Sequence, residues 1–159
     1  MQSVPSHATP LRLVQPASID LARAAAALGA QAESWLGSSV ESNRPGNRRF
    51  LTDLSLPLRE RSPNLTFKKA AFVDLGDVHE TPHGYEVEIG WQSSSLAPLF
   101  PVFAGRLLMT TSELRLEGFY APPGGEFGAV LDRAFLNIAA RGTARWFLGR
   151  TAEVLTRSE

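Results

Sequence analysis

The chain has 159 residues, no cysteine, and sixteen acidic residues that balance sixteen basic ones. This length suits one domain. The lack of cysteine excludes disulfides, thiolate metal sites and cysteine nucleophiles. Nothing therefore requires an oxidising compartment, and we expect a cytoplasmic protein. The balanced charge offers no whole-molecule field for nucleic acid, and no stretch approaches the roughly 20 apolar residues of a membrane span.

The first part of the chain is predicted to contain a loose segment, a short strand and a helix. Residues 1–10 are rich in proline and serine and form the loose lead-in. Leu11 to Val14 alternates in polarity, which is typical of a strand. The Ala-rich run from Ile19 to Leu36 is predicted to form one helix, with Ser18 as the N-cap and Gly37 as the C-cap.

From Arg49 onward the apolar period changes to two, which indicates strands. The clearest strand places Tyr85, Val87, Ile89 and Trp91 on one face and polar residues on the other. The connections are of hairpin length, which favours antiparallel pairing. The strands are expected at about residues 49–57, 66–78, 85–91, 103–110 and 114–120.

A single long helix is predicted from about residue 125 to residue 155. At 100° per residue its broad apolar face contains Phe127, Val130, Leu131, Ala134, Phe135, Ile138, Gly142, Gly149 and Ala152. This face has to be buried across the sheet, and the space between helix and sheet is then either core or pocket.

Arginine side chains are the sharpest candidates for orienting a ligand in that space. Arg145 falls on the predicted buried face of the helix, and burying a guanidinium without a partner is very costly. It is expected either to pair with Glu117 or Asp74, or to orient the polar end of a ligand. Arg106, on a predicted strand, is a weaker candidate for the same two roles.

Large side chains supply the candidate contact area for a ligand, although such residues also fill ordinary cores. The candidates are Trp91, Phe103, Met109, Phe119, Tyr120 and Trp146.

Two motifs are rejected on physical grounds. The run from His79 to His83 matches the zinc-protease string HExxH, but that chemistry requires a helix, and Pro82 and Gly84 favour an exposed hairpin turn. The basic cluster around Arg48 is too narrow to indicate a nucleic-acid surface. The sequence therefore predicts no metal site and no cofactor.

The second half of the chain resembles the START-like (SRPBCC) superfamily, which includes polyketide cyclases and lipid-transfer domains. The resemblance covers about residues 70–155 and is greatest to uncharacterised bacterial members. It rests on Trp91, Phe100-Pro101, Phe103, Gly105, Leu114-x-Leu116-x-Gly118-x-Tyr120-x-Pro122-Pro123 and Asp132. It implies an α+β helix-grip domain over residues 11–157, with a curved, mainly antiparallel sheet wrapped around one long C-terminal helix, often enclosing an apolar cavity.

Three functions remain open at this point. The first is binding of a hydrophobic or amphipathic small molecule between sheet and helix. The second is a polyketide cyclase/aromatase-like or hydrolase-like enzyme using the same cavity, with an acid/base group among Asp132, Glu117, Tyr120 and Asp74. The third is an interaction module with a filled core, which makes contact through the apolar insert Leu96–Phe100. The sequence specifies neither the ligand nor the oligomeric state.

Overall fold

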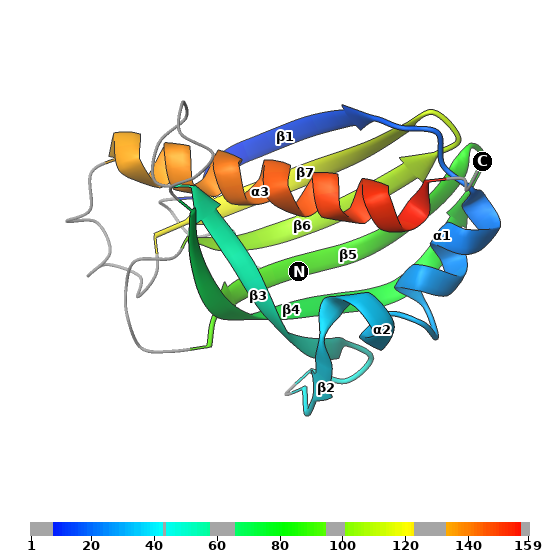
Figure 1. Ribbon diagram of the computed structural model, residues 1–159, viewed down its shortest axis with the longest axis horizontal. Coiled ribbons are helices and arrows are strands. Elements are labelled where there is room, and N and C mark those ends of the chain that lie inside the picture. The colour runs from blue at the N-terminus through cyan, green and yellow to red at the C-terminus, as the bar shows by residue number, and fades with distance from the viewer. Residues whose placement is uncertain (1–7, 43, 58–65, 95–100, 123–132, 157–159) are drawn as a thin grey trace.

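A computed structural model describes residues 8–42, 44–57, 66–94, 101–122 and 133–156, and the structural statements below concern these residues (Figure 1). The elements in chain order are β1 (Thr9–Pro16), α1 (Leu21–Leu28), α2 (Glu33–Leu36), β2 (Ser38–Val40), β3 (Arg48–Pro57), β4 (Thr66–Thr81), β5 (Gly84–Ser93), β6 (Val102–Thr110), β7 (Glu113–Ala121) and α3 (Arg133–Leu155).

The strands form one curved antiparallel sheet in the order β1-β7-β6-β5-β4-β3-β2. The long helix α3 lies across the concave face of this sheet, and β3 curls round so that it passes beside the helix (Figure 1). The predicted α+β helix-grip architecture is confirmed, and so is the meander of hairpin-connected strands in the second half of the chain.

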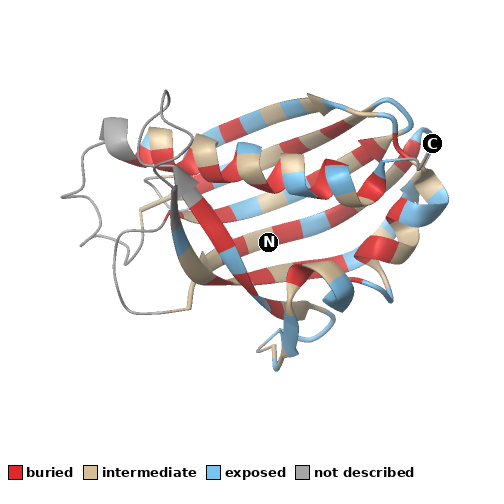
Figure 2. Cartoon of the chain, in the orientation of Figure 1, coloured by how far each residue is buried: buried red, intermediate tan, exposed pale blue. Residues whose placement is uncertain are grey.

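Alternation of buried and exposed residues along the strands explains how the sheet acquires a buried face (Figure 2). In β5, Val87, Ile89 and Trp91 are buried against the helices, as the sequence predicted. The neighbouring Glu86 and Glu88 face outward, where Glu86 pairs with an arginine of β6. The concave face is therefore the core side.

Two facing glycines, Gly105 on β6 and Gly118 on β7, allow an aromatic ring to lie directly on the concave face. A Cβ added at Gly118 would lie 2.3 Å from the carbonyl oxygen of Ala104 and 2.9 Å from Cζ of Phe103. The Phe103 ring thus occupies the space that a side chain at position 118 would need.

The first helical region differs from the prediction of one continuous helix, because α1 ends at Leu28 and α2 begins at Glu33. The break is fixed by a tertiary contact: Arg48 donates hydrogen bonds to the carbonyl oxygens of Leu28 and Gly29, each at 2.7 Å. The N-cap also differs, since Asp20 rather than Ser18 accepts from the backbone N–H of Arg23.

The predicted buried face of α3 was wrong in the part of the helix whose burial is described, whereas Phe127, Val130, Leu131, Ala134 and Phe135 lie outside that part. Ile138, Gly142 and Gly149 are only partly buried and Arg145 is exposed, although Ala152 is buried. The structure buries an alanine-rich face instead, because small side chains let the helix approach the sheet closely. The buried residues of this face are Leu136, Ala139, Ala140, Thr143, Ala144, Phe147, Leu148, Thr151, Ala152 and Leu155.

Candidate functional site

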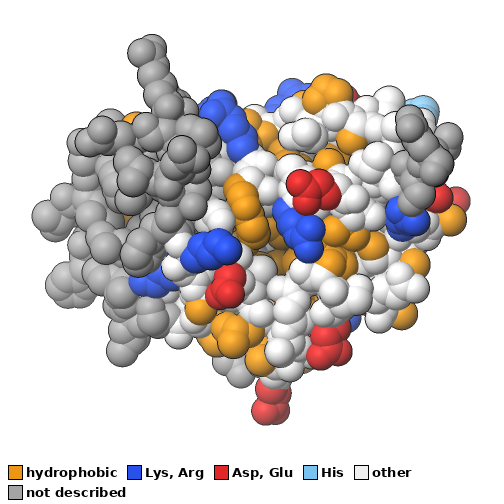
Figure 3. All heavy atoms as spheres, viewed as in Figure 1, with side chains coloured by type: hydrophobic (Ala, Val, Ile, Leu, Met, Phe, Trp, Pro, Cys, Tyr) orange, Lys and Arg blue, Asp and Glu red, His pale blue; other side chains and the backbone are white. Residues whose placement is uncertain are grey.

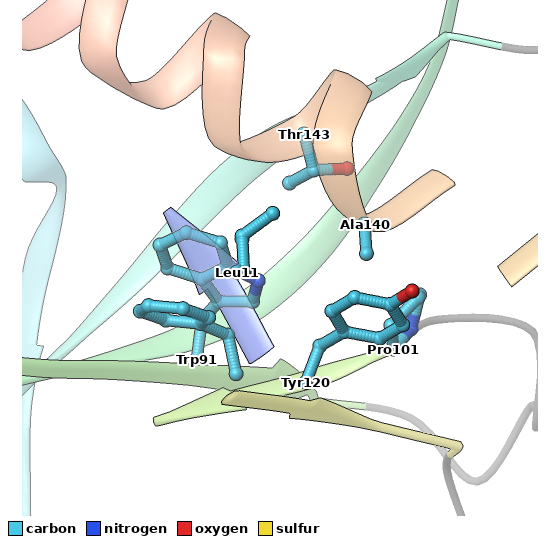
Figure 4. Close-up of a pocket in the computed structure, with 7 residues that line it drawn as sticks. Leu11, Trp91, Pro101, Tyr120, Ala140 and Thr143 are labelled. Atoms are coloured by element: carbon cyan, nitrogen blue, oxygen red, sulfur yellow. The ribbon is translucent and has the colours of Figure 1, made fainter. Parts of the chain in front are cut away.

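The candidate site is an inner space between the concave face of the sheet and the first turns of α3 (Figure 4). It lies at the end of the sheet where β5 and β7 end and where β6 and α3 begin. At the opposite end, the backbone N–H of Asp20 donates to the carbonyl oxygen of Leu155 at 3.1 Å and so joins the start of α1 to the end of α3. The residues that line the inner space are Leu11, Trp91, Pro101, Phe103, Tyr120, Ala140 and Thr143.

Aromatic side chains fill most of this inner space. The rings of Trp91 and Phe103 stack with centroids 4.5 Å apart, and Trp91 also meets Phe147 of α3 at 5.3 Å. The remaining cavity volume is about 0 Å³. The space is therefore closed in this structure, and a ligand could enter only if a side chain moved.

Two hydroxyl groups reach this otherwise apolar space. Tyr120 donates a hydrogen bond of 3.1 Å to Oδ1 of Asn137 on α3. Thr143 is 1% exposed, and its hydroxyl has no hydrogen-bond partner among the described residues. By contrast, Thr151 on the same helix donates to the carbonyl oxygen of Phe147 at 2.8 Å, the usual arrangement for a buried helical threonine.

An unpaired buried hydroxyl is expensive, costing about 1–3 kcal/mol relative to a paired one. Thr143 therefore stands out as a polar group for which the protein itself supplies no partner. The sequence analysis missed both Thr143 and Asn137. The signal in the sequence is a hydroxyl among the alanines at positions 139, 140 and 144, and it points to the inner space only once this face of the helix is known to be buried.

The predicted large contact residues separate into four environments. Trp91, Phe103 and Tyr120 meet in the inner space. Met109 is buried in the core but does not line that space. Phe119 is 42% exposed on the convex face of the sheet, and Trp146 lines a different pocket, described below.

Neither predicted arginine lies in the inner space. Arg145 is exposed, so the premise that its guanidinium is buried was wrong. Arg106 is on the convex face, where it contacts Glu86 at 3.3 Å and Glu117 at 3.5 Å. A polar group of a ligand in the inner space would therefore meet hydroxyl groups rather than a guanidinium.

Two of the four acid/base candidates face away from the inner space. Glu117 contacts Arg12 and Arg115 as well as the arginine of β6. Asp74 accepts two hydrogen bonds from Arg49, at 2.7 and 3.1 Å, and this bonding raises the pKa of the Arg49 guanidinium despite partial burial. Asp132 and the insert 96–100 lie outside the described residues.

The HExxH segment does not form the helix that zinc proteases need. His79 lies near the end of β4, and Thr81 pairs with Gly84 across the turn into β5. Within the described ranges, no group of three or more histidine, aspartate or glutamate side chains is placed to hold a metal ion. No described helix is both long enough and apolar enough to cross a membrane.

A second pocket lies at the seam where α2, β3 and α3 meet, and we call it the seam pocket. Its volume is about 210 Å³. The residues that line it are Trp35, Leu36, Thr52, Asp53, Trp146, Phe147 and Arg150.

No protein-family model matches the sequence, and no curated protein sequence matches it either. Solved structures do match the fold. The Zhui aromatase/cyclase from a Streptomyces species superposes with a TM-score of 0.56 at 9% identity, over 92% of this chain and 93% of that one. A conserved protein from Geobacillus kaustophilus superposes with a TM-score of 0.51 at 12% identity, over 91% of this chain and 93% of that one.

The di-domain ARO/CYC protein BexL superposes with a TM-score of 0.56 at 14% identity, covering 98% of this chain but 52% of BexL. This chain thus spans about half the length of that relative. Identities this low establish the fold alone. Together with the sheet order and the position of α3, they show that the chain has the helix-grip fold.

Proposed function

We propose that this domain binds a small, planar, hydrophobic or amphipathic molecule in the inner space, between Trp91 and Phe103 on the sheet and Thr143 on α3. The observation that carries the proposal is the buried Thr143 hydroxyl, which lines an aromatic space and lacks a partner among the described residues. A ligand oxygen would satisfy it and recover the cost of its desolvation. The structural likeness to proteins named as aromatase/cyclases adds support at the level of the fold.

Because the inner space is closed, binding requires a side chain to move, and Tyr120 is the best candidate. It sits at the end of β7 and is held to the helix by one hydrogen bond, to the exposed Asn137. A typical intramolecular hydrogen bond contributes only about 0.5–1.5 kcal/mol net. Turning the Tyr120 ring outward would break this bond and bring into solvent a side chain that is only 6% exposed, a loss of roughly 1.5–3 kcal/mol that the bound ligand has to offset by burying its own apolar surface in the same place. The movement would leave a slot beside the stacked pair of Trp91 and Phe103.

The residues around the slot define the class of ligand. Two stacked rings favour a flat aromatic molecule, and the polar groups at hand are the neutral hydroxyls of Thr143 and Tyr120. The polar end of the ligand is therefore expected to be an uncharged hydroxyl or carbonyl group rather than a carboxylate.

A matched pair of probes tests this proposal: 2-naphthol, and 2-methylnaphthalene, in which a methyl group replaces the hydroxyl. Isothermal titration should show tighter binding of 2-naphthol. Thr143→Val should weaken 2-naphthol about 3- to 10-fold, the equivalent of one hydrogen bond, and leave 2-methylnaphthalene unchanged. The same variant should melt about 2–8 °C higher, because it removes an unsatisfied hydroxyl.

The two readouts separate a ligand-binding role from a purely structural one. A rise in Tm with unchanged selectivity between the two probes would show that Thr143 does not contact the ligand. If neither probe binds, the inner space is simply core. Tyr120→Phe is the companion variant: it keeps the ring, breaks the bond to Asn137, and should speed probe association.

Among the acid/base candidates that the structure describes, a cyclase-like or hydrolase-like activity would have to begin from Tyr120, since Glu117 and Asp74 are held in ion pairs on the convex face. The binding proposal does not depend on catalytic turnover. The Tyr120→Phe variant would test both roles, because it removes the hydroxyl that catalysis would need and keeps the ring that lines the inner space.

A further inference from the structure

The seam pocket is separate from the inner space and has a different chemical character. Two indole rings, those of Trp35 and Trp146, line it together with the edge of Phe147. Trp35 is fixed in place because its indole N–H donates to the carbonyl oxygen of Ala27 at 2.8 Å. In the space-filling view, hydrophobic side chains are exposed in the middle of the face that carries α3 and β3, flanked by basic and acidic ones (Figure 3).

The charges at the rim of the seam pocket do not balance. Arg150 is exposed and already contacts Glu153, one turn further along α3, at 3.3 Å. Asp53, on the β3 side, is exposed and has no ion-pair or hydrogen-bond partner among the residues that the structure describes. Asp53 is thus the charged residue lining the seam pocket that has no ion pair within the described part of the chain.

A third feature is a buried hydroxyl group. Thr52 is 8% exposed and lines the seam pocket, and its Oγ1 has no hydrogen-bond partner within the described part of the chain. The seam pocket therefore combines indole faces, one unpaired negative charge and one unpaired hydroxyl.

We propose that the seam pocket is a second ligand site, which binds a small organic cation of the alkylammonium type. The electron-rich faces of tryptophan attract such cations, and a nearby carboxylate adds Coulomb attraction. The cation would lie against Trp35 and Trp146 with Asp53 at the rim, and a hydroxyl on the ligand would pair with Thr52. This inference is independent of the function proposed for the inner space.

Choline and its uncharged carbon isostere neohexanol are the probes, because they share shape and hydroxyl and differ in charge. Protein NMR of the three tryptophan indole N–H signals reports where each probe binds. Choline should shift the signals of Trp35 and Trp146 and leave that of Trp91, in the inner space, nearly unchanged. Neohexanol should bind at least 10-fold more weakly.

Two surface variants provide the matched test. Asp53→Asn should weaken choline at least 5-fold, and raising the salt concentration should weaken binding to the wild type. Arg150→Gln removes a nearby positive charge and should leave choline binding equal or tighter. Both side chains are exposed, so both variants should fold.

Several outcomes would overturn the inference. Equal binding of neohexanol and choline would mean that the pocket recognises shape and not charge. An Asp53→Asn variant with unchanged affinity would remove the carboxylate from the site. Tighter binding of benzoate than of choline, lost in Arg150→Gln, would mean that the pocket selects anions.

Discussion

Arg48 is predicted to be the most important single charged residue for stability, although it resembles a surface arginine in the sequence. Its guanidinium donates to the carbonyl oxygens of Gly29 and Leu28, each at 2.7 Å, and of Gly76 at 2.9 Å. It therefore joins the end of α1 to the irregular part of β4, where the register shifts between Leu75 and Val78.

The magnitude follows from these three bonds. A hydrogen bond to a charged group contributes about 1.5–3 kcal/mol, so three set an upper limit of about 4.5–9 kcal/mol. The real loss should be smaller, because Arg48 borders an open pocket of about 460 Å³ where water can reach the freed carbonyls. We expect Arg48→Met, which keeps most of the aliphatic stem, to cost about 2–4 kcal/mol.

Urea denaturation measures this loss as a lower midpoint at unchanged m-value. Arg48→Lys should fall between wild type and Arg48→Met, because one ammonium group cannot reproduce the planar donor fork. Arg12→Met is the control, since Arg12 is a mostly exposed residue with one ion pair on the convex face and should cost about 0.5 kcal/mol or less. Equal effects at positions 48 and 12 would refute the reasoning.

Two glycine substitutions are predicted to act in opposite directions. Gly118→Ala should destabilise the fold by more than about 2 kcal/mol, because the added Cβ would lie 2.3 Å from the carbonyl oxygen of Ala104 and 2.6 Å from Cα of Gly105. An unchanged Tm would contradict the close approach of β6 and β7. Gly149→Ala should stabilise by about 0.5–1 kcal/mol, because nothing lies within 4 Å of the added Cβ in the interior of α3. Thermal unfolding of both variants checks the pair, and a loss of stability at position 149 would count against the described orientation of α3.

The sheet was predictable because its pattern is local. Val87, Ile89 and Trp91 alternate with two glutamates and a glycine, so period two fixes both the strand and its buried face. The break between α1 and α2 was not predictable in this way. The run from Ile19 to Leu36 contains no proline, and its one local break signal is Gly29, the C-cap of α1. The side chain that holds the end of α1 in place is Arg48, twenty residues after Leu28.

The orientation of α3 was missed because both of its sides carry apolar or small residues, so periodicity alone does not select one of them. Close approach to the sheet decided the outcome and favoured Ala140 and Ala144 over Ile138. In this orientation of the helix about its axis, Arg145 is exposed and Thr143 is buried. The aromatic half of the candidate site was therefore predictable, whereas its polar half depended on a helix rotation that the sequence did not specify.

Phe147 connects the two proposed sites, and its position determines how they would influence each other. It is 1% exposed, its ring lies 5.3 Å from that of Trp91 in the inner space, and it lies 6.2 Å from that of Trp35 in the seam pocket. If a ligand enters the inner space by turning Tyr120 outward, Phe147 stays in place and the two sites bind independently. If Phe147 yields instead, its ring must move into the seam pocket, and by linkage each ligand would weaken the other by the same factor. Tyr120 would give up one hydrogen bond and the packing of its ring in the inner space, and the ligand that replaces the ring restores that packing. Phe147 would give up its packing against both Trp91 and Trp35, so independent binding is the outcome that the energetics favour.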